Sequence, residues 1–335
     1  MAKPHNLLLR VAVVSAILLF SLAAVLVMGL SLGSTHAGWD AIVNTLLGRG
    51  PSDPMLQAII WHIRFPRVLL AALVGAALSA GGLVFQALLR NPLAEPYILG
   101  ISGGSAIGAI IGITLGLSRF PGVTLMAFAG SMCTLMLVMI ISSGQRILKK
   151  DALLLAGVMV NAFCSAVIMF LISMTQDARL HNIIFWLMGD MSMTDLPQVG
   201  ILSAILIPGF ILIFCLSHAM NLLLMGREMA MSMGLQLKTI TVTLLVVTSL
   251  MVSATVSHCG LIGFVGLVIP HLLRMVLGPD HRVLVPACIL GGGAYMVFCD
   301  LLARTLPQQG EMPAGVITAL IGAPLFIALL QRSNR

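Results

Sequence analysis

The chain reads Asn221-Leu-Leu-Leu-Met-Gly-Arg-Glu-Met-Ala-Met-Ser-Met-Gly-Leu-Gln-Leu-Lys238 between two long apolar runs. In this polar stretch Gly226 can end the preceding helix, and Arg227–Met233 can form a short helix. Gly234 can then end that helix in left-handed geometry, as glycine commonly does. Connections between packed helices usually need only about 2–8 residues, so the length of this one predicts an added function. Two interpretations follow: a handle for a partner protein, or an interfacial helix that lies on lipid.

The composition around this stretch decides the class of protein. Of 335 residues, 59% are hydrophobic and 9% are charged, and the mean hydropathy is +1.09. A soluble domain carries about 25% charged residues, so a soluble fold is excluded. The net charge of +7 does not indicate nucleic acid, because cationic loops are how membrane proteins orient themselves. We expect an all-α, polytopic membrane protein.

Ten apolar runs predict ten membrane spans, because each is near the ~20 residues that cross a bilayer as a helix. They form one transmembrane domain over residues 1–335, with no separate soluble domain. The first run is longer than the apolar core of about 7–15 residues in a signal peptide, so we expect a retained span. The predicted spans are Val11–Leu32, Val68–Leu89, Tyr97–Leu117, Gly122–Ser142, Ala152–Ser173, Pro197–Ser217, Thr239–Ser257, Leu261–Leu277, Leu284–Ala303 and Ala314–Leu330.

Basic residues predict the orientation. With the N-terminus inside, 12 of the 18 Lys and Arg residues fall on the inner side, as the positive-inside rule requires. Both termini and the loop 220–238 are therefore predicted to be cytoplasmic. Near the outer end of the ninth span, Asp300 and Arg304 are four residues apart and can pair on one helix face. The six cysteines form no C-x-x-C pair, so we interpret them as small buried hydrophobic residues.

The sequence also limits the mechanism. A proton-coupled carrier normally has acidic residues deep in its helices, and none lies clearly at mid-membrane here. The sequence has no G-x-x-x-x-G-K-[ST] nucleotide-binding loop, so an ATP-driven process would need another chain to hydrolyse ATP. A secondary transporter or channel stays open as the alternative. A membrane enzyme would need His or carboxylate groups clustered at one depth, which the sequence does not suggest.

Three further stretches carry local signals. Arg64-Phe-Pro-Arg67 opens the second span, and Arg90-Asn-Pro-Leu-Ala-Glu-Pro96 is a turn whose prolines forbid a continuous helix. Pro270 should kink the eighth span, which Gly278-Pro279 ends. Helix punctuation and capping would explain most of these residues. We expect a structural role for Gln86, Asn91, Pro92, Pro96, Pro270 and His271, with the amide of Gln86 finding a partner because an unsatisfied amide in lipid is expensive.

Several motifs occur in a fixed order along the chain. They are R-F-P-R at 64–67, G-G-x-x-x-Q-x-x-x-R-N-P-L-A-E-P at 81–96, L-G-x-S-x-G at 99–104, G-F-V-G-L-V-x-P-H-x-x-R at 263–274, G-x-D-H-R at 278–282, E-M-P-A-G at 311–315 and G-A-P-x-F at 322–326. In this the chain resembles FecCD-type permeases, the membrane subunits of binding-protein-dependent ABC importers for iron-siderophores, haem and cobalamin. The resemblance covers about residues 61–330.

The resemblance implies a cobalamin-permease-like (type II) importer fold of ten helices in a bacterial plasma (inner) membrane. Spans two to five and seven to ten would be inverted repeats. The partners would be a second permease copy, two ATP-binding subunits, a periplasmic or lipid-anchored substrate-binding protein, and membrane lipid. ATP and Mg would bind to the ATPase, with no cofactor or metal held by this chain. Which metal chelate is carried stays open; His181 in an outer loop could ligate a haem iron, although a lone loop histidine is usually not a ligand.

The resemblance also assigns residues to roles. The ATPase-coupling residues would be Gly226, Arg227, Glu228, Met229, Ala230, Met231, Ser232, Met233, Gly234 and Leu235. Arg64, Arg67 and Arg304 would receive acidic residues of the binding protein; lipid headgroups, or a private Asp300–Arg304 pair, are the alternatives. Asn161, Ser165, Asn182 and Trp186 would line the substrate pathway.

Overall fold

The computed structural model describes residues 4–32, 54–142, 150–307 and 310–333, and in these ranges the chain is helical without any β-strand. The helices are α1 (Pro4–Ser31), α3 (Pro54–Ala58), the π-helix η1 (Ile59–Arg64), α4 (Phe65–Leu89), the 3-10 helix η2 (Pro96–Leu99), α5 (Ile101–Thr114), the π-helix η3 (Arg119–Val123), α6 (Thr124–Ser142), α7 (Lys150–Ser173), α8 (Asp177–Leu187), α9 (Leu196–Cys215), α10 (Ser217–Leu224), α11 (Arg227–Ser232), α12 (Leu237–Cys259), α13 (Val265–Leu277), α14 (His281–Thr305) and α15 (Ala314–Ser333).

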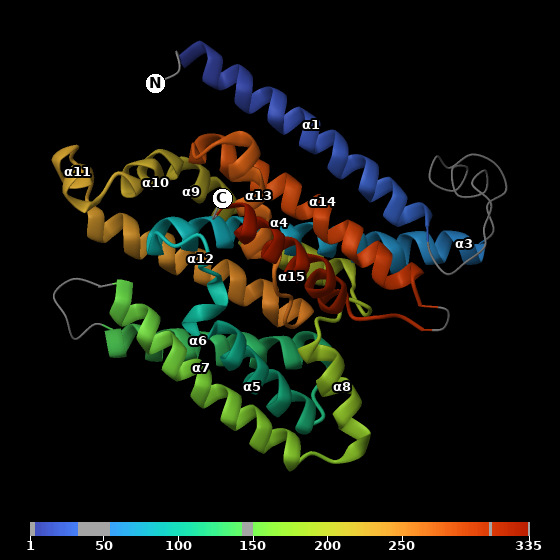
Figure 1. Cartoon of the computed structure of the whole chain (residues 1–335). Helices are drawn as coiled ribbons and strands as arrows, with labels where there is room; N and C mark the ends of the chain where they lie inside the picture. Colours follow the sequence, from blue (N-terminus) through green and yellow to red (C-terminus); the bar gives the residue numbers. More distant parts are fainter. Residues whose placement is uncertain (1–3, 33–53, 143–149, 308–309, 334–335) are drawn as a thin grey trace.

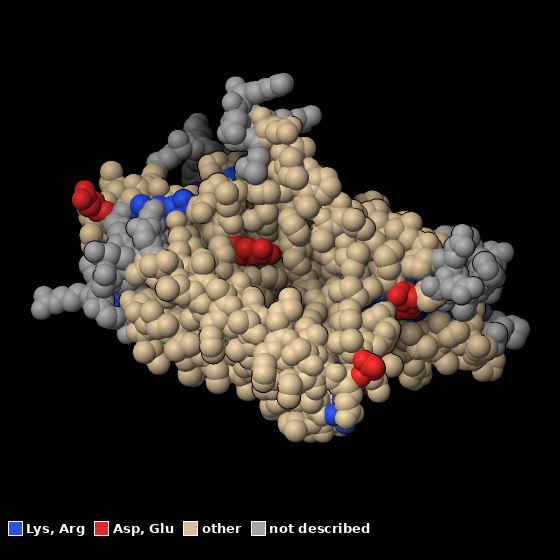
Figure 2. Space-filling model, turned by 60° about the horizontal axis from the view of Figure 1, so that its bottom comes forward, with Lys and Arg blue, Asp and Glu red and all other residues tan. Residues whose placement is uncertain are grey.

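The predicted all-α membrane architecture is confirmed. In the described ranges, seven helical segments are long and apolar enough to cross a membrane, and three apolar helices are shorter. Each of the ten predicted spans coincides with one of these. The face of the molecule in Figure 2 is largely free of charged side chains, which gather in a few places. A surface of this kind suits contact with lipid.

The span boundaries differ from prediction in an instructive way. The second span starts before Val68, because Pro54–Leu89 is one continuous helical segment that includes Arg64 and Arg67. The third and eighth spans are shorter than predicted, because α5 and α13 are preceded by backbone that is apolar but not α-helical. At 1.5 Å per residue, α13 is about 20 Å long, which is less than the ~30 Å of a bilayer core. The segment 260–264, which precedes α13, is buried or half-buried.

Helix α4 is the centre of the molecule, with most of its side chains buried. It packs most extensively against α14, and also against α12, α13 and α9. Figure 1 shows α1 beside α14 on one flank and the group α5, α6, α7 and α8 on the other. Small residues allow the closest contacts: a β-carbon at Gly82 would collide with the backbone of Gly266 on α13. Such glycine contacts are typical of membrane helix packing.

Helices α1 and α7 each leave a long apolar face uncovered. On α7 the exposed side chains include Leu155, Met159, Phe163 and Phe170. The hydropathic part of α1 has no buried side chain except near its C-terminal end. Apolar faces of this length need lipid or another protein as their surroundings.

Candidate functional site

The polar stretch of the sequence forms a short helix at one end of the molecule. Helix α11 covers Arg227–Ser232 and lies beside α10 and the start of α12 (Figure 1). Gly226 and Gly234 flank it with φ angles of 115° and 81°, which favour glycine. The Leu235 N–H donates to Ala230 O (3.0 Å) and the Gly234 N–H to Met231 O (2.9 Å). This is the Schellman arrangement, so the predicted helix and its glycine ends are confirmed.

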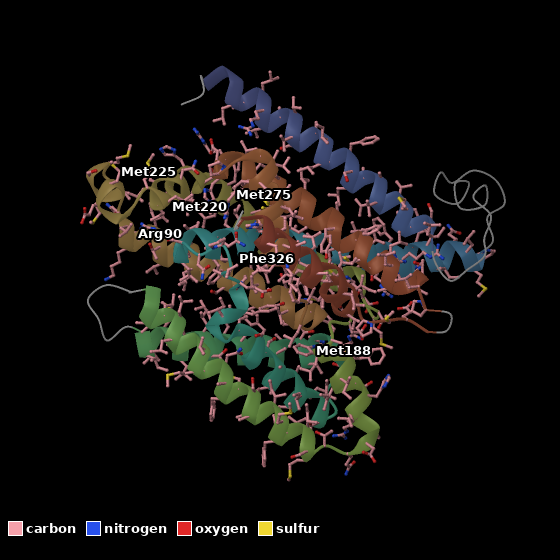
Figure 3. All side chains as sticks on the ribbon, in the orientation of Figure 1. Arg90, Met188, Met220, Met225, Met275 and Phe326 are labelled. Carbon is pink, nitrogen blue, oxygen red and sulfur yellow. The ribbon has the colours of Figure 1, made fainter. Side chains whose placement is uncertain are left out.

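The outer face of α11 is apolar although the helix lies at the tip of the molecule. The side chain of Ala230 is buried, whereas Met229, Met231 and Met233 are more than half exposed. Met225 and Arg90 lie at the same end (Figure 3). They line an open cavity of about 590 Å³ together with Glu228, Met229 and Ser232. Methionine is flexible and adapts to partner surfaces, so this face suits a protein contact.

Asn221 connects this end to a long helix of the core. Its Nδ2 donates to Asp280 Oδ1 (2.8 Å), and its Oδ1 accepts the backbone N–H of His281 (2.9 Å). Asp280 also accepts the N–H of Arg282 (3.0 Å) as the N-cap of α14. The segment that carries α11 is therefore hydrogen-bonded to the first turn of α14.

Gln86 holds α4 against α13 at the site of a proline. Pro270 has no N–H, so the carbonyl four residues earlier, at Gly266, loses its helical donor. The Gln86 Nε2 donates to Gly266 O (3.3 Å) and to Leu267 O (3.4 Å), and Arg274 donates to Gln86 Oε1 (3.1 Å). The expected partner for Gln86 is thus present. Helix α13 contains Pro270 and ends at Leu277, before Gly278-Pro279, where the sequence predicts its end. The kink expected at Pro270 stays a prediction.

Replacing Gln86 with alanine should lower the free energy of unfolding by about 1–3 kcal/mol, because the Gly266 carbonyl and Arg274 lose a buried partner. Thermal unfolding in detergent measures this, with Gln331→Ala on the exposed end of α15 as the control. A variant of normal stability with a switched substrate preference would contradict a structural role for Gln86.

Helix α4 ends at the turn 90–96, as its two prolines lead us to expect. Helix α4 ends at Leu89, and Pro96 opens η2. The Asn91 Oδ1 accepts the N–H of Leu93 (2.9 Å), and Asn91 O accepts the N–H of Ala94 (3.0 Å). These bonds form a compact turn around Pro92. His271 is not part of this turn: it lies on α13, with its ring centroid 6.1 Å from that of Phe326.

The turn supports the non-helical segment 260–264, which the sequence did not predict. The Tyr97 hydroxyl donates to Ile262 O (2.9 Å) and accepts the Ile262 N–H (3.3 Å). The Glu95 carboxyl accepts a backbone hydrogen bond from Phe264, whose φ of 68° is unusual for a residue other than glycine. Burial raises the pKa of the Glu95 carboxyl to about 7. The only signal for these contacts in the sequence is that Glu95 and Tyr97 lie next to Pro96 and close to Pro92.

The raised pKa of Glu95 predicts a pH dependence of stability. Its folded-state pKa of about 7 lies above the ordinary 4.5, so its protonated form is favoured by folding. Its contribution is complete below pH 4.5 and is lost as the pH rises through 7. Thermal unfolding from pH 4.5 to 8 should show this loss in the wild type and a flatter profile in Glu95→Gln. Parallel profiles would refute the assignment.

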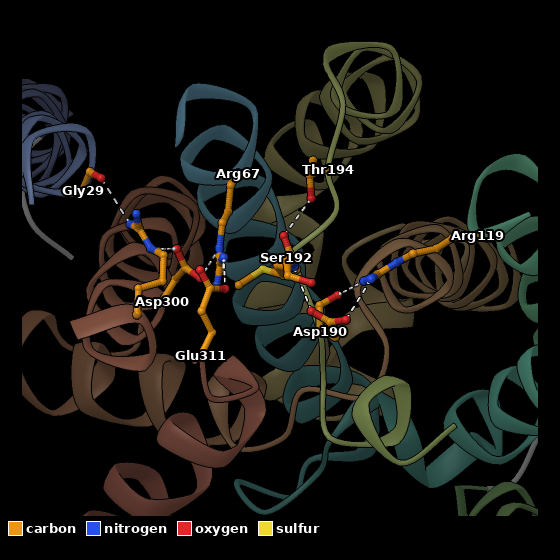
Figure 4. A network of polar contacts seen from close by, with 10 residues as sticks. Gly29, Arg67, Arg119, Asp190, Ser192, Thr194, Asp300 and Glu311 are labelled. Carbon is orange, nitrogen blue, oxygen red and sulfur yellow. Dashed lines mark hydrogen bonds and ion pairs between the residues drawn. The ribbon is translucent and has the colours of Figure 1, made fainter. Parts of the chain in front are cut away.

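A cluster of arginines and carboxylates lies at the end opposite α11 (Figures 1 and 4). The Arg67 Nε pairs with Asp300 Oδ1 (2.9 Å), and its NH1 with Glu311 Oε2 (2.5 Å). The Arg304 Nε pairs with Asp300 Oδ2 (2.9 Å), which confirms the predicted i,i+4 pair. We call these four residues the arginine–carboxylate cluster. The single Asp300 carboxylate therefore pairs with two buried cations, Arg67 and Arg304.

The end of α1 is bonded to two arginines near this cluster. The NH2 of Arg304 donates to Gly29 O (3.2 Å), and the NH1 of Arg64 donates to Leu30 O (2.9 Å) and Ser31 O (3.1 Å). Cations are favourable at a helix C-terminus because the last carbonyls are unpaired there.

The burial of these arginines departs from the expected picture. Arg64, Arg67 and Arg304 are all buried, whereas direct docking to a binding protein requires accessible guanidinium groups. They lie within the packed helical segment 54–89 and on α14, and they bond to groups of the same chain. Glu311 is the half-exposed member of the cluster, and no role is predicted for it from the sequence. A docking role for the three arginines stays a prediction.

A cavity of about 520 Å³ lies between α8, the end of α5 and the residues after α8. Asn182 and Trp186 line it, together with His181 and Arg179. Arg119, which also lines it, pairs with Asp190 Oδ2 (2.8 Å) and donates to Asp190 O (2.7 Å) (Figure 4). Asn161 and Ser165 do not join them, since they lie on α7. The structure thus brings together two of the four predicted pathway residues.

A second, apolar cavity of about 510 Å³ lies where α8, the segment 260–264 and α15 meet, lined by Met188, Leu261 and Gly315 among others. A β-carbon at Gly315 would collide with the carbonyl of Met188 and crowd that of Leu261. The start of α15 therefore packs directly against the end of α8 and the non-helical segment.

Comparison with known proteins agrees with the sequence motifs. The model of the FecCD transport family matches residues 18–332. The vitamin B12 import system permease protein BtuC of Salmonella arizonae is 40% identical over 316 residues, which cover 93% of each chain. The uncharacterized ABC transporter permease protein YvrB of Bacillus subtilis (strain 168) is 38% identical over 325 residues, covering 94% of this chain and 92% of YvrB.

Two solved structures resemble the fold. A metal-chelate type ABC transporter in an inward-facing conformation matches with a TM-score of 0.85 and 31% identity, covering 95% of this chain and 98% of the other. PsaBC from Streptococcus pneumoniae, solved in complex with Fab, matches with a TM-score of 0.60 and 19% identity, covering 86% and 94%. At that identity PsaBC supports the fold alone.

Proposed function

The chain belongs to the FecCD transport family, and from this premise we propose that it imports a metal chelate by ATP-driven alternating access. It is a multi-pass membrane permease of the ABC importer class. In the proposed assembly, two copies of the chain enclose the substrate pathway in the bacterial plasma (inner) membrane. Two ATP-binding subunits lie on the cytoplasmic side, and a substrate-binding protein docks on the other.

The observation that carries this proposal is helix α11. It presents Met229, Met231 and Met233 to the surroundings at the tip of the molecule, with both helix ends defined by glycine. In the proposed assembly this face contacts the ATPase. Closure of the ATPase on ATP would move α11, and the Asn221–Asp280 hydrogen bond (2.8 Å) would pass the movement to α14.

The direction of transport requires that each conformation be stabilised by a different partner. ATP-bound ATPase would stabilise one conformation from the cytoplasmic side. The loaded binding protein would stabilise the other through the arginine–carboxylate cluster, because carboxylates and guanidinium groups form strong paired hydrogen bonds. The chain itself forms no covalent bond with the substrate and needs no cofactor of its own in this mechanism.

For the substrate we propose cobalamin first, because BtuC, named for vitamin B12 import, is 40% identical to the chain over most of its length. Haem and iron-siderophores are the competing chelates. Vesicles that contain the permease and its ATPase should accumulate one of the three when binding protein and ATP are supplied. Omitting the ATPase should abolish uptake. Undiminished uptake without it would instead indicate a secondary transporter or channel.

A further inference from the structure

The two carboxylates bound to Arg67 are not equivalent. The side chain of Asp300 is fully buried at 0% exposure, and it also holds Arg304. The side chain of Glu311 is 45% exposed and pairs with Arg67 alone among the described residues. Burial makes the Asp300 pair costly to break, whereas an ion pair with an exposed member contributes little. Asp300 is thus the fixed partner of Arg67, and Glu311 is the one that can be exchanged.

Glu311 belongs to the short segment that leads into α15. After it, the Met312 N–H donates to Ala303 O (3.1 Å) at the end of α14, and α15 begins at Ala314. The next residue, Gly315, packs against the carbonyls of Met188 and Leu261. Gly315, at the junction of α15, α8 and the segment 260–264, is therefore only four positions after the exchangeable carboxylate.

We propose that Glu311 occupies, in the free permease, the place of an acidic side chain of the substrate-binding protein. On docking, the partner's carboxylate replaces Glu311 on the NH1 of Arg67, while Asp300 stays bound to the Nε. The inference rests on the proposed docking function and deepens it. It accounts for the burial of Arg67, since the surface in front of its guanidinium is covered by this chain's own carboxylate.

An exchange of this kind leaves no buried charge unpaired. Arg67 keeps two carboxylate partners before and after docking, so the penalty of an isolated buried cation does not arise. Released Glu311 is already half exposed and enters water at little cost. The segment 310–313 then keeps the Met312–Ala303 hydrogen bond as its tie to α14. Docking thereby loosens the start of α15, beside α8 and the second cavity.

The test is the affinity of the purified substrate-binding protein encoded beside the permease, measured on the permease–ATPase complex in lipid nanodiscs. Glu311→Gln removes the competing charge and should lower the dissociation constant roughly twofold to tenfold. Asp177→Asn is the control, because it removes one exposed charge from the first turn of α8, away from the cluster. The control should leave the dissociation constant within about twofold. An unchanged or weaker affinity of Glu311→Gln overturns the exchange.

A second measurement uses the wild-type complex. Hydrogen exchange of residues 310–316 should rise when the binding protein is added, because Glu311 leaves Arg67. Unchanged or reduced exchange there overturns the proposal even if Glu311→Gln is poorly folded. If the binding protein fails to bind the wild-type complex at all, the proposed importer function is wrong. If it binds the wild type and Glu311→Gln equally, only the exchange is wrong.

Discussion

Asp300→Asn should destabilise the folded chain by about 3–5 kcal/mol, because it removes the shared partner of two buried cations. The asparagine is nearly the same size, so the loss is electrostatic and leaves no cavity. Arg67 would keep only the half-exposed Glu311, and Arg304 would keep its bond to Gly29 O. Thermal unfolding in detergent, and the yield of monodisperse protein, measure the effect.

The control for Asp300→Asn is Asp177→Asn, the same change at an exposed position. It should leave the unfolding temperature where it is, because Asp177 is exposed and forms no ion pair with any described residue, and such a carboxylate contributes little to stability. Equal unfolding temperatures for the two variants would show that Asp300 is not the central member of the arginine–carboxylate cluster.

Gly234→Val should reduce ATP-driven uptake at least tenfold while the chain remains folded in the membrane. At a φ of 81° a residue with a β-carbon costs about 1–2 kcal/mol, and a β-branched one more, so the end of α11 would unwind. A cost of about 1.4 kcal/mol corresponds to tenfold in population. Uptake into vesicles and co-purification of the ATPase should both fall, whereas the unfolding temperature should change little.

The matched control is Gly200→Val. Gly200 lies in helix α9, where an added β-carbon would meet no other atom within 4 Å, as at Gly234. It differs in having ordinary helical geometry, so the two variants separate backbone conformation from side-chain bulk. Full uptake and normal ATPase binding by Gly234→Val would remove α11 from the coupling role.

The features that the sequence predicted well are local. Gly226 and Gly234 bound a short helix because glycine has access to positive φ whatever surrounds it. The break at Arg90–Pro96 follows from two missing N–H donors. The need of Gln86 for a partner follows from the cost of an unsatisfied amide, although the identity of that partner depends on how α4 crosses α13.

The features that the sequence could not predict depend on distant contacts. Hydropathy does not distinguish an apolar helix from apolar extended backbone, so the segment 261–264 was included in a span. The sequence predicts that Arg64-Phe-Pro-Arg67 opens the second span from outside, with the span itself starting at Val68. The burial of Arg67 depends on Asp300, which lies 233 residues away, and Arg64 bonds to the carbonyls of Leu30 and Ser31 at the end of α1. Glu311 has no local pattern that separates it from an ordinary surface acid, and for Glu95 the only local signal is its nearness to two prolines.

The non-helical backbone at 260–264 has a consequence for how the chain is made. Tyr97 bonds to the N–H and carbonyl of Ile262, and Glu95 accepts from the N–H of Phe264, so these side chains take the place that water would have outside a bilayer. Tyr97 is synthesised 165 residues before Ile262, and chains fold from the N-terminus during synthesis. The acceptors and donors for this segment are therefore already in the membrane when it leaves the ribosome. In a circularly permuted chain, α12 and α13 would be synthesised before Glu95 and Tyr97. The backbone N–H groups of the segment would then have no partner in the lipid, so this chain should insert poorly.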